Sequence, residues 1–202
     1  MTQMTTQTFT EVAERHAAQD MLRKGIYGKM NGQFRGCSIG CFLYDYEPDV
    51  ATDHVNVHAR LAKHTGIAKW ALYVQDYLFE SLPNPAEWHV ECAKAYDAFS
   101  GDWDQAAHRF MARVQREVVA NPTEHNERVA ALHDRAASGD MPDADEWSAA
   151  ESAAESAAES AAGSAAESAV WLAAWLAAGS AVWLAVKDIF LAVLDEPKPL
   201  HE

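Results

Sequence analysis

Apolar residues recur every three or four positions along most of the chain. Ile67, Trp70, Ala71 and Val74 keep the i, i+3, i+4, i+7 spacing of one helix face. Gly or Pro residues separate the segments that share this period. The pattern predicts helices over residues 8–24, 54–64, 67–78, 84–99, 103–118 and 123–138. We therefore expect a mostly all-α fold.

Residues 26–35 interrupt the helical period. Asn31-Gly32 separates two short runs, 26–30 and 33–35, and both residues tolerate the positive φ angles of a tight hairpin turn. The sequence thus predicts a small N-terminal β-hairpin. After it we expect a glycine-containing turn at Gly36–Cys41 and an acidic loop over residues 44–53.

The last third of the chain repeats a tetrapeptide. From Trp147 onward, ten consecutive units begin with Trp, Glu or Gly and carry Ala in third place. Because alanine has the highest helix propensity, residues 144–194 are expected to form a long helix, with bends at Gly163 and Gly179. The interpretation is one helical body (residues 1–140) on which the Trp- and Leu-rich half of a repeat helix (residues 141–202) packs.

A membrane span is the alternative for this segment. Residues 168–186 are uncharged over about the length that a span needs. Ala, Ser and Gly make up much of the run, and Lys187 and Asp188 follow it directly without a basic flank that would set an orientation. We do not expect membrane insertion.

Charge is unevenly distributed. The net charge is −14, and residues 141–202 hold 11 acidic against 2 basic residues. Such a chain repels phosphate backbones, so direct nucleic-acid binding is not expected. An acidic helix attracts a basic protein surface instead, and the predicted partner-binding residues are Glu151, Glu155, Glu159 and Glu167. The alternative is a solvated surface that keeps the protein soluble.

The cysteine content points to a reducing compartment. Three cysteines, an odd number, are not typical of a secreted disulfide framework. The first thirty residues contain no apolar run of the signal-peptide kind. A cytoplasmic protein is expected.

The spacing of two cysteines and two histidines is typical of a metal-binding site. Two cysteines with three residues between them are followed, after twelve further residues, by two histidines with three residues between them, which satisfies the C-x2–4-C-x12-H-x3–5-H pattern. The predicted zinc ligands are Cys37, Cys41, His54 and His58. Asp45 and Ala51 stand where a DNA-binding finger has its core aromatic and leucine. The pattern therefore indicates a structural zinc site and not a DNA-reading finger.

Alternatives to this ligand set remain open. His64 or Cys92 could substitute for one of the four ligands. The two cysteines could equally be buried thiols beside surface histidines. A redox pair or a nucleophilic Cys37 is a third interpretation, although Arg35 is the one basic residue beside it.

Several short motifs resemble an uncharacterised group of bacterial and phage-borne proteins. The shared segments are Gly36-Cys37-Ser38-Ile39-Gly40-Cys41, His58-Ala-Arg-Leu, Thr65-Gly66-Ile67 and Phe79-Glu80-Ser81-Leu82-Pro83-Asn84, with Ala-rich repeats following. Ala68 stands where the group usually has proline. The resemblance covers most of residues 20–190. It implies a phage or mobile-element setting, and Cys37, Cys41 and His58 correspond to the group's motif.

Two functions are compatible with these features. The first is a non-enzymatic interaction protein with a structural zinc site, whose acidic helix meets a basic partner. In a phage setting that partner could be a host nucleic-acid-processing enzyme of a defence system, in the cytoplasm of a bacterial host. The second is a metal-dependent hydrolase or redox enzyme that uses the Cys/His cluster with an open coordination position.

Overall fold

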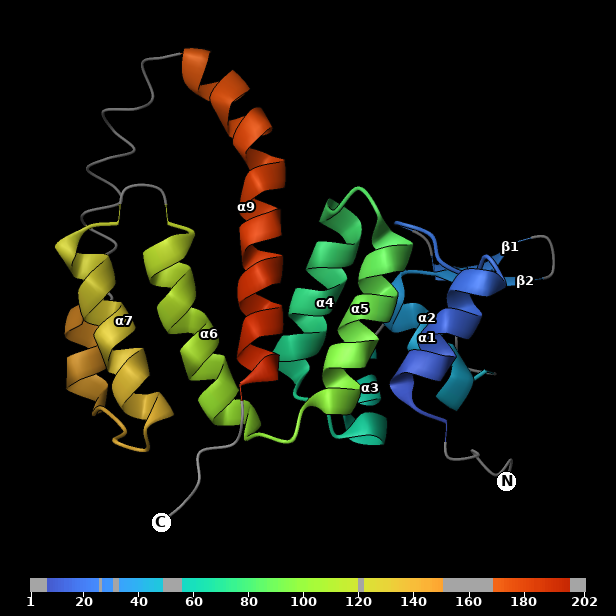
Figure 1. Cartoon of the computed structure of the whole chain (residues 1–202), viewed down its shortest axis with the longest axis horizontal. Coiled ribbons are helices and arrows are strands. Elements are labelled where there is room, and N and C mark those ends of the chain that lie inside the picture. Colours follow the sequence, from blue (N-terminus) through green and yellow to red (C-terminus); the bar gives the residue numbers. More distant parts are fainter. Residues whose placement is uncertain are drawn as a thin grey trace. The chain divides into compact units, whose positions relative to one another are not determined.

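The computed structural model describes residues 7–25, 27–30, 33–48, 56–119, 122–150 and 169–196 (Figure 1). The described part is mostly helical with one small pair of strands, which confirms the predicted fold class. Two compact units divide the chain after Phe99, whereas the sequence suggested a boundary after residue 140. Unit 1 is Met1–Phe99 and unit 2 is Ser100–Glu202, and each is described by itself.

Unit 1 begins with a capped helix and the predicted hairpin. Helix α1 (Phe9–Ala18) starts at Thr8, whose hydroxyl and the Glu11 carboxylate form a reciprocal capping box. The helix ends before the predicted Lys24, with Asp20 in the left-handed region at φ 55°. Strands β1 (Tyr27–Met30) and β2 (Gln33–Gly36) then pair antiparallel, as expected.

Helix α2 (Ser38–Tyr46) lies where a turn and the start of a loop were expected. That prediction is wrong for residues 38–41 and 44–46. Ile39, Phe42 and Leu43 keep i, i+3, i+4 spacing and are at most 2% exposed. Burial of this short apolar face outweighs the unfavourable helix propensity of Gly40.

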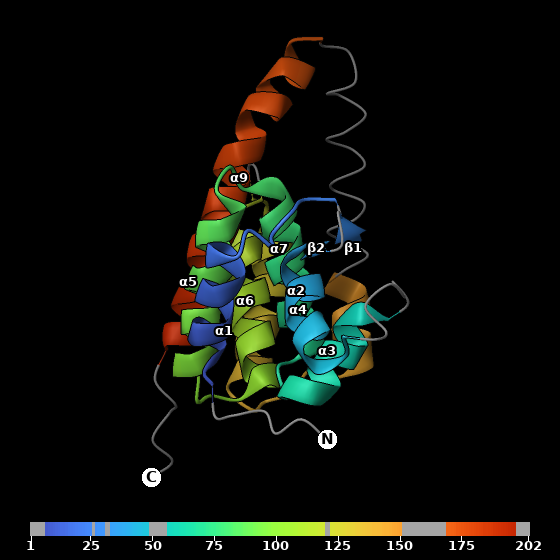
Figure 2. The same cartoon turned by 90° about the vertical axis from the view of Figure 1, so that its right-hand side faces the viewer.

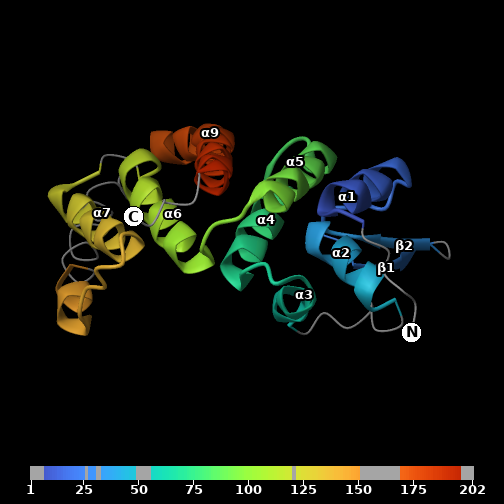
Figure 3. The ribbon, with the colours of Figure 1, turned by 60° about the horizontal axis from the view of Figure 1, so that its bottom comes forward.

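Three further helices complete unit 1: α3 (Val57–Thr65), α4 (Lys69–Ser81) and α5 (Pro85–Ala98). Helix α5 packs against both α1 and α4 (Figures 2 and 3). Its Trp88 is 1% exposed and donates from Nε1 to the Gln75 carbonyl oxygen at 2.9 Å. The Tyr96 hydroxyl donates to the Ala71 carbonyl oxygen at 3.1 Å, so two aromatic anchors fix α5 to α4.

Unit 2 contains α6 (Trp103–Glu117), α7 (Glu124–Ala137), a helical stretch at residues 144–150 and α9 (Ala169–Asp195). Helix α6 contacts both α7 and α9. Trp147 packs on a small core of Val129, Leu132 and Ala150. On the α9 side, the rings of Phe110 and Phe190 meet edge to face at 6.0 Å.

The last turns of the long C-terminal helix are buried. Among residues 181–195, where the structure describes the side chains of α9, the buried ones are Ile189, Phe190, Val193 and Leu194. Of the expected docking residues, Leu184 is 46% exposed, and the side chains of Trp171, Leu172, Trp175 and Leu176 lie outside the described part. The helix continues through Gly179. Glu151, Glu155, Glu159 and Glu167 lie outside the described residues, as does Gly163.

The length and the apolar content of a helix decide whether it can cross a membrane. None of the helices within the described ranges is both long and apolar enough to cross a bilayer.

Candidate functional site

Cys37 directly precedes α2, and its side chain lies close to two carboxylates of α4. It is the N-cap residue of α2. Its Sγ and one carboxylate oxygen from each of Asp76 and Glu80 lie within 4.8 Å of one another. Burial, followed by the charge of Asp76, raises the pKa of the Cys37 thiol. The thiol is therefore held protonated when no cation is present.

Cys41 has a different environment. It is 0% exposed, and its Sγ donates to the carbonyl oxygens of Met21 at 3.6 Å and Gly36 at 3.5 Å. Burial and the nearby Asp45 raise the pKa of this thiol to about 12. The Cys41 thiol is thus committed to backbone acceptors beside β2, and it does not join the cluster around Cys37.

His58 lies on α3 and faces the same carboxylate as Cys37. Its Nε2 is 3.2 Å from Asp76 Oδ2, and its ring stacks on Tyr73 with centroids 4.0 Å apart. His54, the other predicted ligand on this segment, lies outside the described residues. Of the predicted zinc ligands, the structure therefore brings Cys37 and His58 to Asp76. The four-residue zinc site stays a prediction.

The two substitute ligands are engaged elsewhere. His64 Nε2 is 2.6 Å from Glu47 Oε1, and hydrogen bonds from Arg60 and then from His64 lower the pKa of the Glu47 carboxyl. Cys92 is 0% exposed in α5, where burial raises the pKa of its thiol. Neither forms part of a three-residue metal-binding group within the described ranges.

A buried polar network runs through the core of unit 1 beside this cluster. His16 Nε2 lies 2.6 Å from Asp45 Oδ2, and His16 Nδ1 lies 3.1 Å from His89 Nε2. The Ser38 hydroxyl lies 2.7 Å from His89 Nδ1, and Gln75 Nε2 donates to Ser38 Oγ at 2.6 Å. All but Asp45 are 0% exposed. The network thus joins α1, α2, α4 and α5.

One arrangement of protons satisfies every link of the network. Gln75 donates to Ser38, Ser38 to His89, His89 to His16, and His16 to Asp45. Burial and the neighbouring His16 lower the pKa of His89 well below its ordinary value, so the His89 ring is neutral and can accept from Ser38 while it donates to His16.

Ser38 matches a pattern that the sequence analysis missed. Gly36-Cys37-Ser38-Ile39-Gly40 reads Gly-x-Ser-x-Gly, and the serine stands between strand β2 and helix α2. In hydrolases this turn exposes the serine oxygen to substrate. Here Ser38 is 0% exposed, so a substrate does not reach it in this structure. The hydrogen bond from Gln75 to Ser38 instead positions the residues next to them in the sequence, Asp76 and Cys37.

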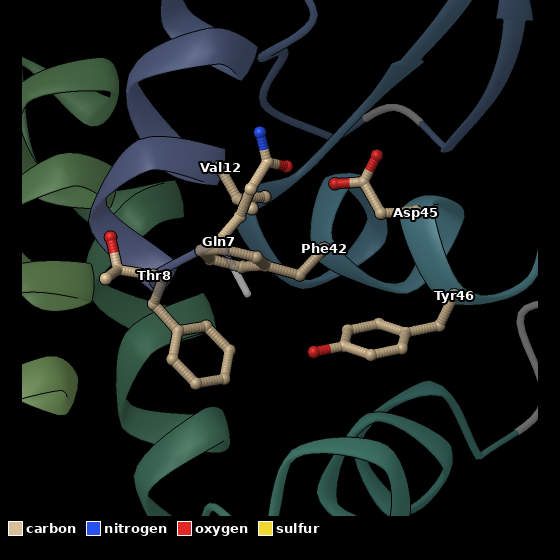
Figure 4. A pocket seen from close by; sticks show the side chains of 7 residues that line it. Gln7, Thr8, Val12, Phe42, Asp45 and Tyr46 are labelled. Carbon is tan, nitrogen blue, oxygen red and sulfur yellow. The ribbon is translucent and has the colours of Figure 1, made fainter. Parts of the chain in front are cut away.

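A small pocket opens where the network approaches the surface. It encloses about 40 Å³ and is lined by Gln7, Thr8, Phe9, Val12, Phe42, Asp45 and Tyr46 (Figure 4). The Asp45 carboxylate on its wall already binds the Arg15 guanidinium at 3.0 and 3.2 Å and His16. The pocket has room for water-sized molecules and offers no free charge to a ligand.

Unit 2 has its own histidine pair. His108 Nδ1 and His133 Nδ1 are 2.9 Å apart, and the His133 ring lies 4.7 Å from the Trp147 ring. Burial and the charge of His108 lower the pKa of His133 to about 4.

This shift predicts acid sensitivity in unit 2. Below pH 6.5 the unfolded chain protonates His133 while the folded chain does not, so stability is lost as the pH falls from 6.5 toward 4. For a half-buried ring the expected loss is roughly 1 kcal/mol after solvent screening. Urea unfolding at pH 7 and pH 4.5 measures it. His133→Gln should reduce the pH dependence; equal slopes for wild type and His133→Gln would contradict the assignment.

The acidic excess of the chain is concentrated in unit 2. Unit 2 holds 18 acidic and 7 basic residues, against 12 and 9 in unit 1. Each of its five arginines already forms an ion pair: Arg109 with Glu196, Arg113 with Glu117, Arg116 with Glu127 and Asp134, Arg128 with Glu124, and Arg135 with Asp140 and Glu146. The remaining negative charge therefore has no arginine in this unit left to neutralise it.

No protein-family model matches this chain, and no curated protein or solved structure shows significant similarity to it.

Proposed function

We propose that this is a non-enzymatic acidic protein that binds a basic protein surface through unit 2. The observation that carries the proposal is the net charge of unit 2, −11, in a unit whose arginines are all internally paired. Surplus carboxylates on one unit create a negative potential that steers a positive partner toward it. The four repeat glutamates, from Glu151 to Glu167, are the proposed contact residues.

The class of partner follows from the same charge. A protein surface that normally holds a nucleic-acid backbone is rich in Lys and Arg. An acidic helix competes for such a surface. With the phage setting implied by the motif resemblance, the proposal becomes an inhibitor of a host nucleic-acid-processing enzyme, acting in the bacterial cytoplasm. A bound zinc would stabilise unit 1 without taking part in the contact.

Charge reversal in the repeats tests the proposal. Binding of the full chain to an arginine-rich peptide is measured by biolayer interferometry for wild type and for the triple variant Glu151→Lys, Glu155→Lys, Glu159→Lys. We expect the variant to bind at least about tenfold more weakly, because three attractive charges become repulsive.

The matched control reverses three glutamates of α1 and α5 in unit 1: Glu14→Lys, Glu87→Lys and Glu91→Lys. Both variants have the same net charge, so they differ in where the charge lies. Binding within about twofold of wild type is expected for the control. Equal weakening of the two variants would mean that net charge alone drives the binding, and the proposed surface would be wrong.

A further inference from the structure

Three potential metal ligands converge between α2 and α4 in unit 1. Cys37 Sγ and carboxylate oxygens of Asp76 and Glu80 lie within 4.8 Å of one another. Asp76 and Glu80 are four residues apart on α4 and so project from the same helix face. Cys37 meets them from the start of α2. A spacing of this kind is compatible with three ligands around one ion of about 2.0–2.3 Å bond length.

Each ligand is held by its own neighbours. The Gly25 N–H donates to both Glu80 oxygens, at 3.1 and 3.0 Å. His58 Nε2 holds Asp76 Oδ2 at 3.2 Å. Next to the cluster, the buried Gln75–Ser38 hydrogen bond of 2.6 Å fixes α4 against the start of α2. A histidine that orients a ligating carboxylate is a common outer partner of protein metal sites.

The cluster also contains an unsatisfied acceptor. Asp76 Oδ1 is shielded from solvent and accepts no hydrogen bond within the described part of the chain. In that same part, no Lys or Arg forms an ion pair with Asp76 or Glu80. His58 is the basic group that pairs with Asp76, at Oδ2 of a side chain that is 23% exposed, and the buried Oδ1 of the same carboxylate is left without such a partner. This is an observation separate from the proximity of the three groups, and it points to a positive ligand.

The geometry points to a site for one divalent transition-metal ion, of the zinc class, held by Cys37 Sγ, Asp76 and Glu80. His58 is the outer residue that orients Asp76. A thiolate favours zinc, cobalt or iron over magnesium or calcium, which take oxygen ligands. This ligand set shares Cys37 with the spacing pattern but excludes Cys41. It lies in unit 1 and does not depend on the partner-binding proposal.

Cobalt is the probe that reports this site directly. Full-length protein is treated with chelator, desalted and titrated with Co²⁺. We expect one cobalt per chain and a near-ultraviolet thiolate-to-cobalt absorption band. Cys37→Ala should abolish the band, and Asp76→Asn should weaken cobalt binding by about 100-fold. Glu80→Gln should weaken it by about tenfold.

Cys41→Ala distinguishes the proposed ligand set, which excludes Cys41, from the set that the Cys/His spacing predicted, which includes it. The variant should retain the band and bind cobalt within about threefold of wild type, because Cys41 contacts backbone oxygens. Far-ultraviolet circular dichroism of each metal-free variant shows whether it is folded, and Cys37→Ser replaces Cys37→Ala if the latter is not. Absence of the band in wild type would overturn the proposal. So would a folded Cys37 variant that keeps the band, or a Cys41→Ala protein that loses it.

Discussion

Replacing His89 with leucine is expected to destabilise unit 1 by roughly 2–5 kcal/mol. The substitution removes the partner of the Ser38 hydroxyl and of His16 Nδ1 at once. Both groups are fully buried, and each buried polar group left without a hydrogen bond costs about 1–3 kcal/mol. Leucine fits the volume, so the loss comes from the broken network and not from a cavity.

Urea denaturation measures this loss. Hydrogen exchange at the α5 amides assigns it to unit 1. The matched control is His64→Leu, which alters a more exposed histidine on α3 and should cost less than about 1 kcal/mol, because it removes one partly exposed ion pair with Glu47. A His89→Leu protein as stable as the control would show that the network contributes no net stability.

Phe190→Ala should destabilise unit 2 by about 3–5 kcal/mol. The ring is 0% exposed and meets Phe110 of α6 edge to face. Truncation of a buried phenylalanine removes its transfer free energy and leaves a cavity. Because α9 is anchored to α6 by its last turns, we also expect faster hydrogen exchange along α9.

Leu184→Ala is the matched control on the same helix. Leu184 is 46% exposed, so its truncation should cost less than about 1 kcal/mol. Thermal unfolding of both variants compares the buried position 190 of α9 with the exposed position 184. If Leu184→Ala destabilised the chain as much as Phe190→Ala, the anchoring of α9 through its final turns would be incorrect.

Local signals in the sequence predicted much of the fold. The Thr8–Glu11 capping box opens α1, Pro85 occupies the first turn of α5, and Asn31-Gly32 separates two strands that pair. Each feature depends on a few consecutive residues, which makes it readable without tertiary information. The main error was α2, where two glycines indicated a turn and the buried Ile39–Leu43 face was given too little weight.

The candidate site was only partly readable. The Cys/His spacing identified Cys37 and His58, but it grouped them with Cys41, whose thiol faces the β2 backbone. Asp76 and Glu80 lie about forty residues further on, and only the packing of α4 against α2 brings them to Cys37. An i, i+4 carboxylate pair is common on solvated helix faces, so the sequence offers no signal that singles out this one.

The salt dependence of partner binding tests the central claim, that surplus charge on unit 2 forms the binding surface. The dissociation constant for the arginine-rich peptide is measured for the full chain from 50 to 500 mM NaCl. Salt screening shortens the range of electrostatic attraction over this interval, so we expect the full chain to bind at least about tenfold more weakly at 500 mM than at 50 mM NaCl. The slope of affinity against salt concentration should be much shallower for the triple repeat variant than for the unit 1 control. A dissociation constant that stays constant across the series, or identical slopes for the two charge-reversed variants, would contradict it.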